Sequence, residues 1–138
     1  MRFILHILVI LLLFTCLACE NENEPAMHPE SNITGYWINP VYYNNIVTYE
    51  RSYQLMDHEY GLAIKSDNSL IERKNAGWCG TPPLSYADFE GSWSTKDSTI
   101  YITVGYWGGT TEYEWKIMRI KEKLLSIEVI NQEHNIDQ

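Results

Sequence analysis

The chain has 138 residues, of which 45% are hydrophobic, 20% charged and 13% aromatic, a length that fits one small globular domain. Its 5 Trp and 10 Tyr supply more buriable apolar surface than a disordered segment carries. A formal net charge of −8 argues against nucleic-acid partners, because binding a phosphate backbone needs a surplus of clustered Lys and Arg. We therefore expect one folded domain that binds no nucleic acid.

Residues 1–18 have the pattern of a secretory signal sequence. Arg2 supplies a positive start, and an apolar run interrupted only by His6 follows from Phe3 to Phe14. This run is shorter than the stretch of about 20 apolar residues that a membrane-spanning helix needs. We therefore expect the segment to direct secretion and to be absent from the mature protein.

Leu17-Ala18-Cys19 resembles the lipobox of bacterial lipoproteins, in which a small residue precedes the cysteine that is lipidated and becomes the mature N-terminus. The resemblance implies that Cys19 is lipidated and that the protein is extracytoplasmic and held to a bacterial membrane, with the outer membrane as the expected site. Residues 19–32 form an expected acidic flexible tether. Such a segment is similar to those that send some lipoproteins to the cell surface, and a solvated spacer is the alternative.

Cys79 is the cysteine that remains once the signal sequence is removed and Cys19 carries lipid. A disulfide within the mature chain is then excluded, so the fold must depend on its hydrophobic core. Cys79 with His58 as base is one hypothesis for thiol catalysis, but nothing in the sequence establishes that pairing. A small buried residue is the favoured role of Cys79, and we expect no enzyme.

Apolar and polar residues alternate with period two along the folded part, as half-buried strands require, and no segment keeps a helical period. In chain order, the eight expected strands lie at residues 35–38, 47–56, 60–65, 69–74, 89–95, 99–104, 112–117 and 125–129. Short links between most of them favour antiparallel neighbours. Residues 132–138 are expected to be a disordered tail.

Eight antiparallel strands predict an all-β, up-and-down barrel over residues 33–131, because closure removes both exposed sheet edges. A β-sandwich of two four-stranded sheets has the same strand count and is the alternative. In a barrel that follows chain order, alternate loops share an end. The link at 57–59, the loop around Trp78 and the turn at 106–109 are therefore expected at the end from which the tether leaves.

Gly35-Tyr36-Trp37 resembles the Gly-x-Trp motif that opens the first strand of lipocalins, and the strand count and mature length are similar to those of small lipocalin-like lipoproteins. In that family the tryptophan closes the barrel floor beneath an arginine from a late strand. The resemblance implies that Trp37 and Arg119 form the barrel floor through a cation–π contact, with Arg51 as the competing partner. The resemblance also implies that the open end of the barrel, its mouth, lies near residues 39–43.

Inward-facing aromatic residues are expected to line a ligand cavity in which Arg51 orients a polar group. The expected ligand-binding residues are Tyr49, Arg51, Tyr53, Tyr113 and Trp115. Pockets for small molecules have volumes of roughly 300 Å³ or more, so the hypothesis fails if side chains fill the interior and leave less space than this. A second group, formed by Trp78 and Cys79 of the long connection at 75–88 and by Trp107, is the expected loop patch.

The leading hypothesis is a lipid-anchored barrel that binds a small hydrophobic, apolar or amphipathic molecule. The alternative is a surface interaction module, in which loop aromatics bind a protein or glycan and the barrel is only a scaffold. We expect no cofactor and no metal, because His28, His58 and His134 are spread over the tether, a turn and the tail, without the spacing of zinc ligands.

Overall fold

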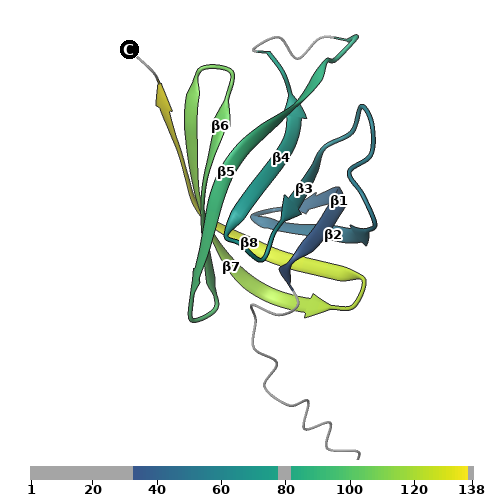
Figure 1. Cartoon of the computed structure of the whole chain (residues 1–138). Coiled ribbons are helices and arrows are strands. Elements are labelled where there is room, and N and C mark those ends of the chain that lie inside the picture. The colour runs from purple at the N-terminus through teal and green to yellow at the C-terminus, as the bar shows by residue number, and fades with distance from the viewer. Residues whose placement is uncertain (1–32, 78–81, 137–138) are drawn as a thin grey trace, which may run out of the picture.

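The computed structural model describes residues 33–77 and 82–136 and shows a closed barrel of eight antiparallel strands (Figure 1). The strands are β1 (Gly35–Tyr43), β2 (Ile46–Ser52), β3 (Gly61–Ile64), β4 (Ser69–Asn75), β5 (Tyr86–Lys96), β6 (Thr99–Tyr106), β7 (Gly109–Lys121) and β8 (Leu124–Ile136). The predicted all-β barrel is confirmed, and the sandwich alternative is wrong. Within these residues no helix is long and apolar enough to cross a membrane.

The order of strands around the barrel is β1-β2-β8-β7-β6-β5-β4-β3, and each strand is antiparallel to both neighbours. Six strands, from β3 to β8, follow one another as in the predicted meander. The first hairpin departs from it, because β1 lies between β2 and β3 while β2 closes the barrel against β8. The link at residues 53–60 therefore crosses from one side of β1 to the other.

This crossing decides which turns share a barrel end. Strands β2 and β3 run in the same direction because both are antiparallel to β1. The turns after β3, β5 and β7 therefore lie where β1 begins, at the Trp37 end, and the turns after β1, β4 and β6 lie at the opposite, Trp107 end (Figure 1). The expected sharing of one end by the tether and the 106–109 turn is wrong, because it assumed strands in chain order.

The long hairpin of β7 and β8 extends beyond the strands predicted from the sequence. Its ladder runs from Gly109 opposite Ile136 to Lys121 opposite Leu124, with one register shift at Ile130 of β8 and one at Met118 of β7. Residues 132–136, expected in the disordered tail, belong to β8 and pair with the start of β7. The tail prediction is wrong for them because these polar residues still satisfy the backbone hydrogen bonds of a neighbouring strand.

The hydrophobic core consists of alternate residues that face the barrel interior. Leu70, Ile100 and Ile127, from three different strands, are each no more than 1% exposed. Other members of this buried cluster are Ile33, Trp37, Val47, Leu62, Ile64, Trp93, Ile102, Val104 and Leu125. Burial of these side chains, at about 1.5–3 kcal/mol each, stabilises the barrel without a disulfide between described residues.

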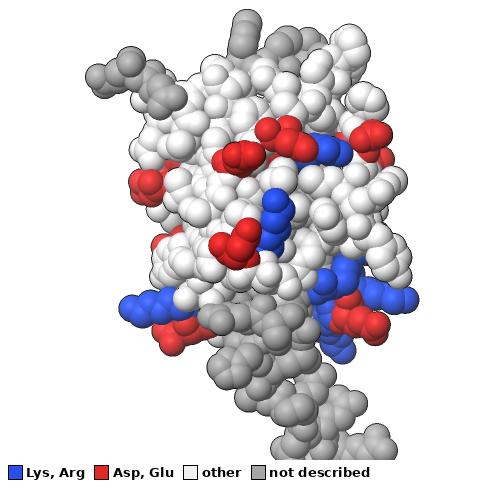
Figure 2. Space-filling model, in the orientation of Figure 1, with Lys and Arg blue, Asp and Glu red and all other residues white. Residues whose placement is uncertain are grey.

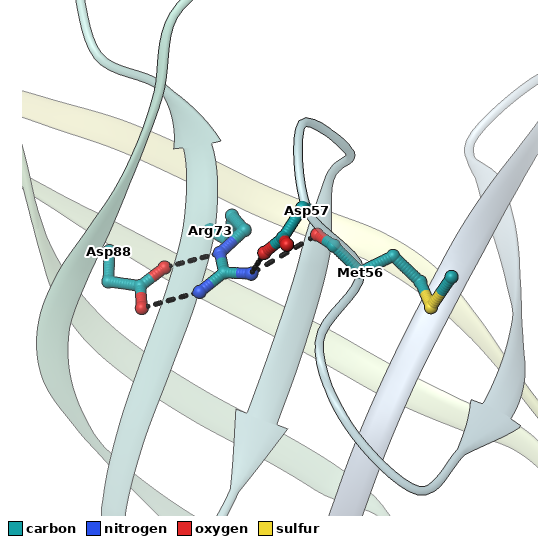
Figure 3. Close-up of polar contacts among 4 residues, drawn as sticks. All are labelled: Met56, Asp57, Arg73 and Asp88. Carbon is teal, nitrogen blue, oxygen red and sulfur yellow. Dashed lines mark hydrogen bonds and ion pairs between the residues drawn. The ribbon is translucent and has the colours of Figure 1, made fainter.

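Arg73, on the outer face of β4, fastens the 53–60 link to the barrel wall (Figure 3). Its guanidinium donates two hydrogen bonds to the Asp88 carboxylate, with N–O distances of 2.6 and 2.9 Å. It also donates to the carbonyl oxygen of Met56 at 3.1 Å and lies 3.5 Å from the carboxylate of Asp57. Hydrogen bonding to Arg73 lowers the pKa of Asp88 below its ordinary value.

Arg73→Lys is expected to speed proteolytic cleavage within residues 53–60, because a lysine cannot make the paired contact with Asp88. The lowered pKa of Asp88 means that this contact stabilises the fold above pH about 3.9 and loses its effect as the pH falls through the folded-state pKa. Limited proteolysis with mass mapping checks this, with exposed Arg119→Lys as control. Equal cleavage rates in both variants would contradict the fastening role.

Candidate functional site

A cavity of about 190 Å³ lies inside the barrel. The residues that line it are Tyr42, Val47, Tyr49, Tyr60, Glu72, Lys74, Tyr113, Trp115, Val129 and Gln132. Tyr42 and Lys74 stand next to the strand ends that meet at the Trp107 end, so the cavity opens there. Its volume equals the liquid volume of about six water molecules. This is below the roughly 300 Å³ that the hypothesis required, so the expectation of a pocket of ordinary ligand size is wrong, and there is room only for a compact molecule.

Glu72 is the one fully buried charged residue among those the structure describes, with 0% exposure. Alternation along β4 turns Leu70, Glu72 and Lys74 toward the interior. The Glu72 Oε1 atom accepts hydrogen bonds from the hydroxyls of Tyr60 and Tyr113, and Oε2 accepts one from Lys74 Nζ. This arrangement satisfies a carboxylate that would otherwise be costly to bury.

The phenol groups around Glu72 are held in their neutral form. Burial raises the pKa of Tyr49, Tyr60 and Tyr113 well above 10, and the nearby negative charge of Glu72 raises them further. Tyr42, near the opening, has a raised pKa for the same two reasons. The cavity wall therefore presents hydroxyls rather than phenolates at neutral pH.

The free energy of unfolding is expected to fall as the pH rises above about 10. The unfolded chain releases its phenol protons first, because the folded-state pKa values are raised, so each buried tyrosine contributes about 1.4 kcal/mol per pH unit to the fall. Denaturant unfolding between about pH 9 and 11 measures the slope. Tyr113→Phe should make it shallower, whereas Tyr53→Phe, at a fully exposed position, should not; equal slopes would refute the assignment.

Trp115 is the cavity residue with an unused hydrogen-bond donor. It is 3% exposed, and its ring packs against Tyr113 and Tyr49 with centroid distances of 5.0 and 6.3 Å. Its Nε1 is buried and has no hydrogen-bond partner among the described residues. By contrast, the indole N–H groups of Trp37 and Trp93 donate to backbone carbonyls at 2.7 and 2.8 Å. An unpaired buried donor costs about 1–3 kcal/mol, so that of Trp115 calls for a partner.

Three of the predicted ligand-binding residues, Tyr49, Tyr113 and Trp115, lie together in the cavity wall. Tyr53 does not, because β2 ends at Ser52 and the Tyr53 side chain is 100% exposed. The expectation that Tyr53 faces the interior is wrong, since the strand alternation that supported it stops one residue earlier.

Arg51 closes the barrel floor instead of lining the cavity. Its guanidinium carbon lies 4.1 Å from the Trp37 ring centroid, and Nη1 donates to the carbonyl oxygen of Thr34 at 2.8 Å. The expected cavity role of Arg51 and the expected floor role of Arg119 are wrong. A register shift between Ile117 and Arg119 breaks the alternation, which leaves Arg119 exposed on the outside.

Glu72 and Lys74 were not among the residues predicted from the sequence, although both continue the inward phase set by Leu70 on β4. Tyr60, Tyr42 and Gln132 were not among them either. Trp107, from the loop patch, is 57% exposed in the turn after β6. The remaining candidates, Cys19, Trp78 and Cys79, lie outside the described residues. Within the described ranges no group of three or more His, Cys, Asp or Glu side chains could hold a metal ion.

The fold and cavity define a class of structure: a closed eight-stranded antiparallel β-barrel, compatible with a lipocalin-like fold, with a compact interior cavity that opens at the end opposite the floor. Compared with known proteins, the chain matches no protein-family model, no curated protein and no solved structure. Membership of the lipocalin-like lipoproteins therefore stays a prediction from the sequence motifs.

Proposed function

We propose that this protein is a lipid-anchored, extracytoplasmic barrel that binds one compact amphipathic molecule in the cavity at the Trp107 end. The observation that carries the proposal is the buried, unpaired indole N–H of Trp115 in a wall of aromatic rings and one ion pair. A bound molecule would fill the space and supply the missing acceptor.

The buried ion pair and the unfilled space of this cavity are not explained by a contribution to stability. A buried ion pair is often no more stabilising than hydrophobic residues of similar volume, and an unfilled cavity loses packing contacts. Both features are concentrated at one end of the interior, whereas the Trp37 end is filled by apolar side chains. A binding site accounts for both features at the same place.

The charge distribution supports the membrane-anchored arrangement. Segments 65–68, 96–98 and 116–123, at the Trp37 end, hold six Lys or Arg and three Asp or Glu, whereas the other described residues hold three and ten. Figure 2 shows blue side chains gathered at this lower end. Positive charge near the tether favours an anionic lipid surface. Anchoring through Cys19 would then leave the cavity mouth facing away from the membrane.

Native mass spectrometry of protein extracted from its own membranes tests the binding function. We expect a small molecule retained at one copy per chain and released on unfolding. Filling the cavity with Val47→Phe should abolish retention, and Val41→Phe, at a 65% exposed position, is the matched control. An empty wild-type protein that also binds none of the compact probes described below would defeat the proposal.

The anchor is tested separately by labelling cells with a fatty acid. Cys19→Ala is expected to remove the label and release the protein from membranes, whereas Cys16→Ala should retain both. If Cys16→Ala lost the label and Cys19→Ala kept it, Cys16 rather than Cys19 would be the lipidated residue.

A surface interaction module is the second candidate, and exposed Trp107 favours it. Tyr43, also at the Trp107 end, is 74% exposed. Under this alternative, Trp107→Ala would abolish capture of a protein or glycan, while a small molecule retained in the cavity would be unaffected.

A further inference from the structure

We infer that the molecule bound in the cavity carries an acceptor oxygen, as a carboxylate or an amide, and that the site rejects cationic ligands. This inference rests on the proposed function and names the chemical class of its ligand. The juxtaposition that carries it is the unpaired Trp115 Nε1–H in the same wall as the Glu72–Lys74 ion pair.

The Glu72 carboxylate, the one negatively charged acceptor of the wall, is already hydrogen-bonded by the protein itself. Glu72 receives hydrogen bonds from two phenol hydroxyls and one ammonium group, which occupy both of its oxygens. These are three of the about four hydrogen bonds that a carboxylate can accept, so a ligand amine competes with Tyr60, Tyr113 and Lys74 for it. Displacing any of the three would leave a buried donor without a partner.

The donor capacity of the wall is in excess. Trp115 Nε1–H has no acceptor among the described residues, and an ammonium has three donors. One donor of Lys74 points to Glu72, and Nζ lies 5.3 Å from the centroid of the Phe89 ring, a contact that uses no ligand acceptor. Trp115 Nε1–H and the remaining Lys74 donors are therefore the groups of this wall for which a ligand oxygen would supply the acceptor.

The charges of the cavity wall also disfavour a cationic ligand. Glu72 and Lys74 are the two charged residues among those lining the cavity, and they neutralise each other. Lys74 is the partner nearer the opening, with a side chain 15% exposed, whereas that of Glu72 is 1% exposed. A cation entering the cavity meets the ammonium before the carboxylate, whereas an anion or a neutral amide is not repelled by Lys74.

The rest of the wall fits a compact apolar body. Tyr49, Tyr113 and Trp115 present ring surfaces, and Val47 and Val129 add aliphatic surface. The volume of about 190 Å³ accommodates one six-membered ring with a small head group. The expected ligands are therefore small aromatic or branched acids and amides.

Titration calorimetry of the full mature protein, freed of retained molecules, with three probes of matched shape tests the head-group preference. The probes are benzoate, benzamide and benzylamine, which carry a carboxylate, an amide and an ammonium. We expect benzoate and benzamide to bind at least tenfold more tightly than benzylamine, because one neutral hydrogen bond corresponds to about a tenfold change.

Two variants and one control separate the contribution of the Trp115 N–H from that of the Lys74 charge. Trp115→Phe keeps an aromatic ring but removes the N–H, and should weaken benzoate and benzamide about tenfold. Trp93→Phe removes an indole whose N–H already donates to Lys65 at the Trp37 end, and should leave binding unchanged. Lys74→Met should weaken benzoate more than benzamide, since only benzoate is charged.

The outcomes distinguish this inference from the proposed function. Tightest binding of benzylamine, or unchanged affinities in Trp115→Phe, would overturn the acceptor-oxygen inference while leaving a ligand-binding barrel in place. Binding of none of the probes would overturn this inference, and together with an empty protein from native membranes it would overturn the proposed function as well.

Discussion

Glu72→Ala is expected to lower the free energy of unfolding by about 3–5 kcal/mol, as measured for buried ion pairs that lose one partner. The substitution leaves the ammonium of Lys74 without its carboxylate and removes the acceptor of the Tyr60 and Tyr113 hydroxyls. It also enlarges the cavity. Denaturant unfolding at neutral pH measures the change.

Two controls show whether the loss comes from the unpaired charge. Adding Lys74→Met to Glu72→Ala removes the orphaned ammonium, so the double variant should be more stable than the single one. Glu90→Ala, at an exposed position on β5, should change stability by less than about 0.5 kcal/mol. A cost below about 1 kcal/mol for Glu72→Ala would mean that Glu72 is not held in a buried pair.

Trp37→Ala is expected to cost about 3–5 kcal/mol, because truncating a buried tryptophan leaves a cavity as well as losing apolar burial. Trp37 is 0% exposed, donates its indole N–H to Ile33 and is covered by the Arg51 guanidinium. The barrel floor therefore loses its largest side chain and two of its polar contacts. Thermal or denaturant unfolding measures the effect.

The two arginines that competed for the floor supply the comparison. Arg51→Ala is expected to cost about 1–2 kcal/mol through the lost cation–π contact and the hydrogen bond to Thr34. Arg119→Ala, at an exposed position, should be close to neutral. A larger loss of unfolding free energy for Arg119→Ala than for Arg51→Ala would contradict the assignment of Arg51 to the barrel floor.

Much of the fold follows from the sequence because period-two alternation reports which face of a strand is buried. That signal located all eight strands and placed Tyr49, Tyr113 and Trp115 inside. Alternation does not report which strand lies beside which, so it could not reveal that β1 pairs with β3. Because of that pairing, every turn from the one between β3 and β4 onward lies at the barrel end opposite to the expected one.

The site was harder to predict than the fold for two local reasons. Register shifts cannot be seen in an alternation pattern, and the one after Ile117 turned Arg119 outward. Charged residues near a strand end also resemble the solvated end of a strand, which is how Glu72 and Lys74 escaped notice. The burial of Glu72 depends on hydroxyl donors brought from β7 and the 53–60 link, which are distant in sequence.

The indole N–H resonances of uniformly ¹⁵N-labelled protein, followed during a benzoate titration, test the central claim most directly. We predict that the Trp115 signal, assigned by its absence from Trp115→Phe, moves downfield as its N–H gains an acceptor. The Trp37 and Trp93 signals should stay in place because their donors are already bonded. A stationary Trp115 signal with a shifted Trp107 signal would contradict cavity binding and favour the exposed surface instead.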